Sequence, residues 1–164
     1  MSSLDKVNKL SKSDFLSIFG NVFEKTEWIA EKTFDFRPFK NFEELFFKMM
    51  DIYNKAQKTS HLKILNAHPE LVVEKKLTIE SREEQNNASL DQCSDEEFKE
   101  FKELNKYYKK KFGFPFIIAV RGKNRKEILE NFKKRISNNI DLEFEEAKNQ
   151  VKKIATFRLN EIIK

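Results

Sequence analysis

Glycine, proline and cysteine are scarce in this chain of 164 residues, which has 3 Gly, 3 Pro and 1 Cys. Few glycines and prolines leave long stretches without helix breakers, so the sequence predicts an all-α protein. Cys93 cannot form an intrachain disulfide, and CxxC metal or redox motifs are absent. A single thiol fits a reducing compartment, and we expect Cys93 to be unreactive because no histidine is near it in sequence.

The sequence also lacks any uninterrupted apolar run of membrane-spanning length, and its N-terminus does not resemble a signal peptide. These absences predict no membrane partner and a cytoplasmic location. No glycine-rich phosphate loop occurs, which argues against a nucleotide cofactor.

Charge is abundant but mixed: 32 basic and 27 acidic residues give a net charge of +5. The two signs are interleaved without a sustained basic stripe, which favours a solvated surface and no nucleic acid. Two short basic clusters, Lys109 to Lys111 and Lys133 to Arg135, leave one alternative open. The protein would then be a basic helical module that binds nucleic acid or a partner protein.

Apolar spacing and start signals predict one domain over residues 1–164, a single-domain multi-helix bundle. Ser11 and Ser94 lead helix-start motifs, and Ser94 with Glu97 forms a capping box. The periodicity predicts further helices over 21–33, from Phe42 to Ala56, from Leu62 to a stop near His68, from about Thr78, over 125–136, and from an Asp141 cap onward.

One apolar stretch stands apart, from Phe112 to Val120, with no charged residue. Gly113 and Pro115 lie within it, so it cannot continue the preceding helix, and we expect a short extended, buried segment near 113–120. The N–H and C=O groups of an extended buried backbone must bond to protein, water or a ligand. This segment is therefore a candidate wall of a binding site.

Two helices carry polar residues where apolar ones are expected. Ser81, Glu84 and Gln85 share one face of their helix, and this trio lies either in solvent or in a polar pocket. In the last helix, Arg158 interrupts an apolar stripe. Its guanidinium needs a carboxylate or an anionic ligand, unless the aliphatic part of the side chain is long enough to place the charge in water.

His68 precedes Pro69, which disfavours helical geometry at the residue before it, and therefore lies at a helix terminus. Its imidazole is suited to proton transfer near neutral pH, although a lone histidine is often structural. His61 is expected to be a cap or exposed. The spacing of the two histidines does not match a familiar metal site, so no metal is predicted.

Four ordered motifs resemble the 2-oxo-4-hydroxy-4-carboxy-5-ureidoimidazoline (OHCU) decarboxylases of urate breakdown. The first is Leu65-Asn-Ala-His68-Pro69-Glu70-Leu71, and the second runs from Leu77 to Leu90 and contains Ser81-Arg-Glu-Glu84-Gln85. The third runs from Leu104-Asn105 to Ile117, and the fourth runs from Val151 to Leu159 and contains Arg158. The resemblance extends to Phe19 to Val22, Trp28 to Ala30 and Arg37 to Phe39, and so covers nearly the whole chain. Ser89 and Glu27 depart from the usual pattern, at positions without a catalytic role.

This resemblance implies an all-helical, cofactor-free decarboxylase, a homodimer, that converts OHCU to (S)-allantoin. It implies His68 as the proton donor, with Glu84 and Arg158 as its catalytic companions. The substrate contacts that it implies are Pro69, Ser81, Arg82, Glu83, Glu84, Gln85, Phe116, Ile117, Ile118, Ala119 and Val120.

Overall fold

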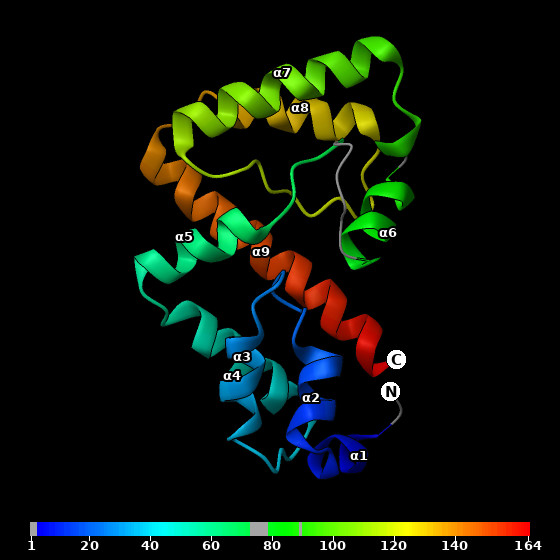
Figure 1. Ribbon diagram of the computed structural model, residues 1–164, viewed down its shortest axis with the longest axis vertical. Helices are drawn as coiled ribbons and strands as arrows, with labels where there is room; N and C mark the ends of the chain where they lie inside the picture. Colours follow the sequence, from blue (N-terminus) through cyan, green and yellow to red (C-terminus); the bar gives the residue numbers. More distant parts are fainter. Residues whose placement is uncertain (1–2, 73–78, 89) are drawn as a thin grey trace. The chain divides into compact units, whose positions relative to one another are not determined.

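The computed structural model describes residues 3–72, 79–88 and 90–164, and over these ranges it contains helices and no strand (Figure 1). The all-α prediction is confirmed. Two compact units divide the chain: one takes in residues up to Ala67 together with 152–164, and the other runs from His68 to Val151. One domain over 1–164 stays a prediction.

Several helices of the first unit begin at polar caps. Ser11 accepts a hydrogen bond from the Asp14 N–H at 3.1 Å, as its start motif predicts, and Asn41 does the same for Glu44 at 2.8 Å. The helices of this unit are α1 (Leu4–Lys9), α2 (Lys12–Phe19), α3 (Glu27–Phe34), α4 (Phe42–Asn54), α5 (Lys58–Ala67) and the last turns of α9.

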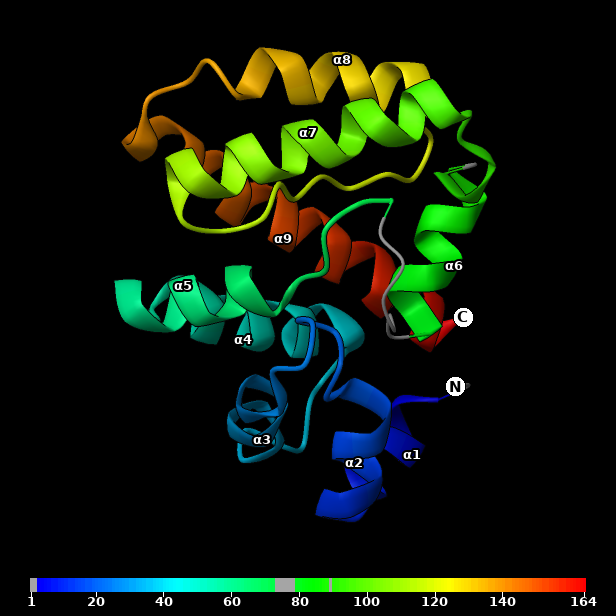
Figure 2. The ribbon, with the colours of Figure 1, turned by 45° about the horizontal axis from the view of Figure 1, so that its top comes forward.

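The second unit contains helices of more varied length. They are α6 (Ile79–Asn87), the 3₁₀ turn η1 (Leu90–Gln92), α7 (Asp95–Phe112), α8 (Arg125–Arg135) and the first turns of α9 (Ile140–Ile163). α7 and α8 run side by side in both ribbon views (Figure 2). The Ser94–Glu97 capping box is present at the start of α7, and Gly113 ends that helix with a φ of 83°, a conformation that suits glycine.

An aromatic cluster forms the core of the second unit. The ring of Tyr108 on α7 contacts Phe112, Phe114, Phe116 and Phe132, with centroid distances from 4.5 to 5.9 Å. Phe116 stacks on Phe132 of α8 at 3.9 Å. The apolar segment therefore supplies core residues as well as a candidate wall.

Three helix starts differ from the sequence prediction, and one of them is that of α5, which begins at Lys58 rather than at Leu62. α3 begins at Glu27 rather than near Asn21, because the Asn21 side chain accepts from the Lys25 N–H at 2.8 Å and Lys25 has a positive φ of 53°. The Asn21 side chain therefore closes a turn that competes with helix. The last helix begins at Ile140, where Asn139, not Asp141, accepts from the Leu142 N–H at 2.8 Å. The start expected at Thr78 lies outside the described residues.

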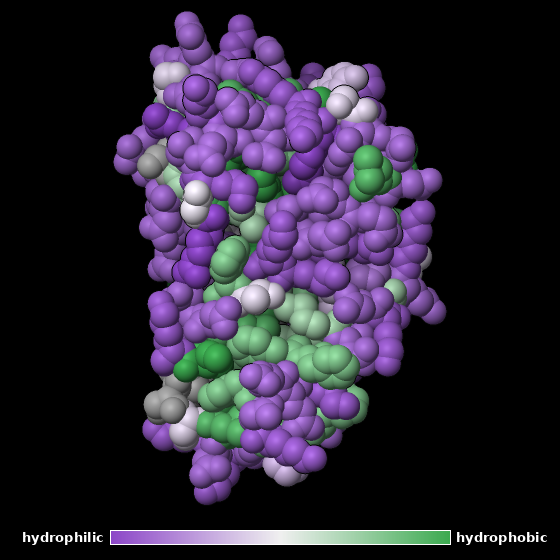
Figure 3. Space-filling view, turned by 180° about the vertical axis from the view of Figure 1, so that it is seen from behind, coloured by the Kyte–Doolittle hydropathy of each residue, from purple (hydrophilic) through white to green (hydrophobic). Residues whose placement is uncertain are grey.

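Hydrophilic side chains cover most of the face drawn in Figure 3, and hydrophobic ones gather on part of it. The large apolar side chains that are exposed include Phe36 and Phe47 in the first unit, and Tyr107, Ile140 and Leu142 in the second. Within the described ranges, no helix is both long and apolar enough to span a membrane.

Candidate active site

His68 follows the last residue of α5 directly, as the position of Pro69 predicts. The side chain is buried, with 6% of its surface exposed, while Pro69 is half-buried. A buried imidazole at a helix terminus is oriented by its surroundings rather than by solvent. Such a group can present a proton from one fixed side.

Two side-chain amides bind the backbone that follows His68. Gln85 on α6 accepts from the Val72 N–H at 3.1 Å and donates to the Glu70 carbonyl at 3.3 Å. Asn105 on α7 donates to the Leu71 carbonyl at 2.8 Å. These bonds replace helical ones that the loop cannot make, and so they fix the loop that carries His68.

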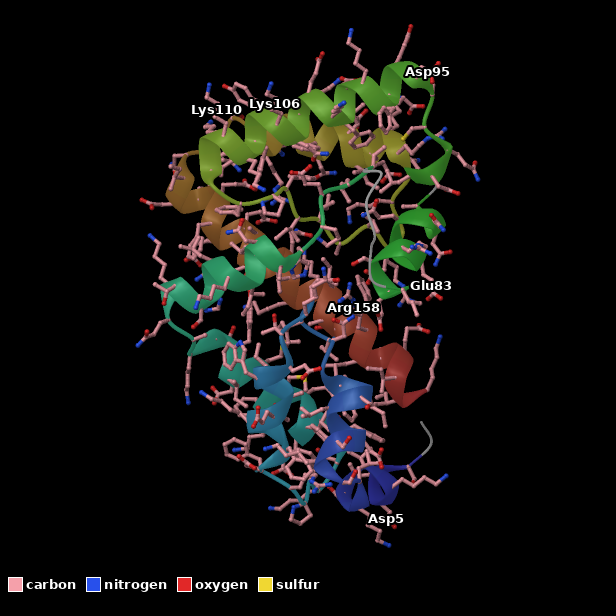
Figure 4. All side chains as sticks on the ribbon, viewed as in Figure 1. Asp5, Glu83, Asp95, Lys106, Lys110 and Arg158 are labelled. Carbon is pink, nitrogen blue, oxygen red and sulfur yellow. The ribbon has the colours of Figure 1, made fainter. Side chains whose placement is uncertain are left out.

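The polar trio on α6 does not lie in solvent. Ser81 and Gln85 are buried and Glu84 is half-buried, whereas Arg82 and Glu83 are exposed. Glu83 extends outward from α6 in Figure 4. Since Ser81, Glu84 and Gln85 share a face and two of the three are buried, the solvated interpretation of the trio is wrong.

The extended segment from Phe116 to Val120 is buried throughout, with no residue more than 7% exposed. Side chains bind alternate residues of its backbone. Arg135 donates to the Ile117 carbonyl at 2.6 Å, the Ala119 N–H donates to Gln150 at 2.9 Å, and Lys123 donates to the Ala119 carbonyl at 3.3 Å. One edge of the segment is therefore bonded to α8, α9 and the following turn.

The other edge of this segment is open. In an extended chain the backbone groups of successive residues point to opposite sides, an alternation that would place the Ile118 groups on the side away from the bonds of Ile117 and Ala119. Ile118 is only 5% exposed, and neither its N–H nor its C=O has a hydrogen-bond partner in the described ranges. A buried peptide group without a hydrogen-bond partner is a suitable contact for a polar ligand.

A charged network lies beneath the segment. Arg135 donates to Glu143 at 2.7 Å, and the other oxygen of Glu143 accepts from Asn138 at 3.0 Å. The Tyr108 hydroxyl also donates to Glu143, at 2.7 Å. Burial, together with the Glu143 carboxylate, raises the pKa of the Tyr108 phenol above its ordinary 10.0. The phenol therefore stays protonated and remains a donor.

Arg158 belongs to the first unit, where it is buried and donates to Glu24 at 2.8 Å and to the Asn21 carbonyl at 3.0 Å. The alternative in which this side chain extends to water is wrong. Glu24 is fully buried and was missed from the sequence, because a helix was predicted over it. Whether Arg158 meets His68 and Glu84 stays a prediction.

The other histidine and the cysteine are structural. His61 is 4% exposed and lies edge-on against Tyr53, with a centroid distance of 4.7 Å, so the expectation of a cap or an exposed side chain is wrong. Burial, then nearby Glu97, raises the pKa of the Cys93 thiol, which disfavours a nucleophilic role. Among the described residues, no group of three His, Cys, Asp or Glu side chains suits a metal ion.

The two basic clusters make internal contacts. Arg135 is buried against Glu143, Lys111 donates to the Ile136 carbonyl at 2.7 Å, and Lys133 pairs with Glu100. Both clusters lie in the last turn of a helix, where positive charge complements the helix dipole. Positive charge at these helix ends is therefore favourable whether or not the protein binds a nucleic acid.

Residues 8–160 match the family model for OHCU decarboxylase. A relative from Haloferax volcanii, named as 2-oxo-4-hydroxy-4-carboxy-5-ureidoimidazoline decarboxylase, is 35% identical over 97% of this chain and 95% of its own length. A "uric acid degradation bifunctional protein" from Bacillus sp. strain TB-90 is 42% identical over the full chain. The chain spans about a third (33%) of the length of that protein and of a second one from Bacillus subtilis.

Two solved structures share the fold. A crystal structure of (S)-allantoin synthase superposes with a TM-score of 0.82 and 27% identity, covering 100% of this chain and 54% of that one. A crystal structure of an OHCU decarboxylase in the presence of (S)-allantoin gives a TM-score of 0.72 and 26% identity, covering 92% and 97% of the two chains.

Proposed function

The chain belongs to the OHCU decarboxylase family, and we propose that it converts OHCU to (S)-allantoin in urate breakdown. The observation that carries this proposal is structural: a buried histidine at a helix terminus and a buried extended segment with one open edge occur in the same unit. The family supplies the substrate, and these two features supply the groups that the reaction needs.

The reaction breaks the carbon–carbon bond to the carboxyl group. CO2 leaves, and the electron pair remains on the ring, where the adjacent carbonyl and ring nitrogens delocalise it. Because the substrate itself spreads this charge, the step requires no metal or organic cofactor. The protein has two tasks, to stabilise the developing charge and to protonate one face of the ring.

His68 is the proton donor in this proposal. Its loop is bound by Gln85 and Asn105, so the imidazole approaches the ring from a fixed side. A proton delivered to one face only gives a single configuration of the product, the S form.

The open edge of the extended segment stabilises the charge. The Ile118 N–H lies in a buried setting, where a hydrogen bond to a developing negative charge is stronger than in water. We assign it to the ring carbonyl, with the neighbouring residues Phe116 to Val120 as the wall. The Ala119 N–H, which already donates to Gln150, is not available for this task.

Glu84 and Arg158 orient the ureido and hydroxyl groups, and Pro69, Ser81 and Gln85 complete the contacts. A tight grip on the departing carboxylate would stabilise the ground state and slow the reaction, so these residues should bind the groups that stay. Arg82 and Glu83 are exposed and are the weakest of the predicted contacts.

We further infer that the protein is a homodimer, as its family resemblance implies, and that it is cytoplasmic, as the sequence predicts. The exposed Phe36 and Phe47 in the first unit, 48% and 65% accessible, are candidate interface residues. Light scattering coupled to gel filtration measures the assembly state. A monomer at micromolar concentration would contradict the inference.

The function is tested by following freshly generated OHCU by circular dichroism. The protein should accelerate its decay and produce optically active allantoin, and His68→Asn should remove about 100-fold or more of that acceleration. His61→Gln is the matched control: it alters the other buried histidine, and should lower stability while leaving the turnover of folded protein near that of the wild type. A His68 variant with full activity would contradict the assignment.

A further inference from the structure

Gln150 and Glu146 lie one turn apart on α9 and connect to the extended segment. The Gln150 amide oxygen accepts from the Ala119 N–H at 2.9 Å, and the Gln150 amide nitrogen donates to Glu146 at 2.7 Å. Gln150 is buried, with 7% of its surface exposed, and Glu146 is half-buried. No motif in the sequence singled out either residue.

The chemistry of the two neighbours fixes the orientation of the amide. A backbone N–H only donates, and an ionised carboxylate only accepts. The Gln150 oxygen must therefore face Ala119, and its nitrogen must face Glu146. Glu146 thus selects the amide orientation that can bind the extended segment.

Together with the bonds from Arg135 and Lys123, this bond sets which way the segment's other backbone groups point. With the Ala119 N–H directed at α9, alternation along the extended chain turns the Ile118 groups to the opposite, open edge. Rotation of the Ala119 peptide would tilt its neighbours. The orientation of the backbone groups at the open edge therefore depends on Gln150, which does not line that edge.

We propose that Gln150, oriented by Glu146, is a positioning residue for the reaction: it binds the Ala119 N–H and thereby aims the open edge at the substrate. This inference rests on the proposed function of the segment. It assigns Gln150 no direct contact with the substrate.

The test compares Gln150→Ala with a charge-exchanged pair, Glu146→Gln with Gln150→Glu. In the exchanged protein a carboxylate at position 150 still accepts from the Ala119 N–H, and an amide at position 146 still donates to that carboxylate. Gln150→Ala should lower kcat roughly tenfold, because the Ile118 N–H would be held less precisely against the developing charge, and should change KM less. The exchanged pair should recover most of kcat.

Two further measurements separate positioning from folding. Asn149→Ala removes an exposed amide at the preceding position of α9, and should leave kcat and KM unchanged. Amide hydrogen exchange at Ala119 should accelerate in Gln150→Ala and return to a slow rate in the exchanged pair. Gln150→Glu alone places two carboxylates side by side and should lower kcat as well, which gives a second variant if the alanine form is unstable.

Each outcome supports or overturns the positioning role of Gln150. Unchanged exchange at Ala119 in Gln150→Ala, or faster exchange with wild-type kcat, would overturn the positioning role. A loss of kcat that the exchanged pair does not recover would also overturn it. If the wild-type protein fails to accelerate OHCU decay, the proposed function fails and the catalytic part of this inference fails with it, while Ala119 exchange still reports whether Gln150 binds the segment.

Discussion

Two non-helical segments of the second unit, the loop after His68 and the stretch from Phe116 to Val120, are fixed by side chains that reach from helices. Two neutral amides, Gln85 and Asn105, bind the loop. The extended stretch is bound by an amide from Gln150 and by Arg135, whose charge is balanced by Glu143.

The difference lies in what each segment leaves available. The backbone of the loop is bonded at Glu70, Leu71 and Val72, and the group that it presents is the His68 side chain. The extended segment contributes its side chains to the core and keeps one backbone edge open. One segment supplies a side chain and the other supplies peptide groups, so variants that loosen each should have different consequences.

The largest effect is expected from Glu143→Gln, which removes the charge that balances Arg135 under the extended segment. Breaking a buried ion pair on one side costs about 3 to 5 kcal/mol of unfolding free energy. Chemical denaturation measures it. Glu145→Gln, an exposed change two residues along α9, is the control and should cost at most about 1 kcal/mol. Equal losses in the two variants would show that the buried network does not support the segment.

Tyr108→Phe removes the hydroxyl that donates to Glu143, a bond to a charged group worth about 1.5 to 3 kcal/mol. The raised pKa of the phenol means that the native state keeps its proton above pH 10.0, where the unfolded state loses it. The stabilisation is therefore complete below that pH and is lost as the pH rises beyond it. The stability gap between wild type and Tyr108→Phe should narrow in alkali. A constant gap would contradict the assigned shift.

Gln85→Ala loosens the other segment, the loop after His68. It leaves the Glu70 carbonyl and the Val72 N–H without their partner, at a cost of about 1 to 3 kcal/mol. Because the loop carries His68, kcat should fall while Ala119 exchange stays slow. Asn86→Ala, an exposed amide at the next position, is the control. Accelerated exchange at Ala119 in Gln85→Ala would mean that the two segments are not independently supported.

Asn105→Ala should have the smallest effect of the series, about 1 kcal/mol, because it removes one bond to the Leu71 carbonyl. Thermal unfolding measures it, with Lys106→Ala as the control. Lys106 is exposed and projects outward from α7 (Figure 4). A larger loss for Asn105→Ala than for Gln85→Ala would reverse the order of the two amides in fixing the loop.

Local features of this fold are predictable from the sequence. The capping box at Ser94, the stop at Gly113 and the break at Pro69 all depend on neighbours within a few positions, and the structure has each of them. The buried apolar segment follows from its lack of charge. The polar face of α6 is visible in the spacing of Ser81 and Gln85, although spacing alone does not say which way that face points.

Partners that are distant in the chain are not predictable in this way. The sequence indicates that Arg158 needs a partner such as a carboxylate. That partner, Glu24, lies 134 positions away, in a polar turn that the sequence pattern predicts as helix. Gln150 gives no signal at all, because a glutamine on a helix is ordinarily solvent-exposed. His61 is similar: its aromatic neighbour Tyr53 comes from another helix, and the sequence pattern does not reveal the contact.

The most direct test is a titration of the isotope-labelled protein with (S)-allantoin, followed through the amide signals of residues 116–120. We expect the Ile118 signal to shift strongly and its hydrogen exchange to slow, while the Ala119 exchange, already slow through Gln150, stays the same. A response confined to Ala119, or no response in this segment at saturating ligand, would contradict the claim that one edge is bonded to the protein and the other is open to substrate.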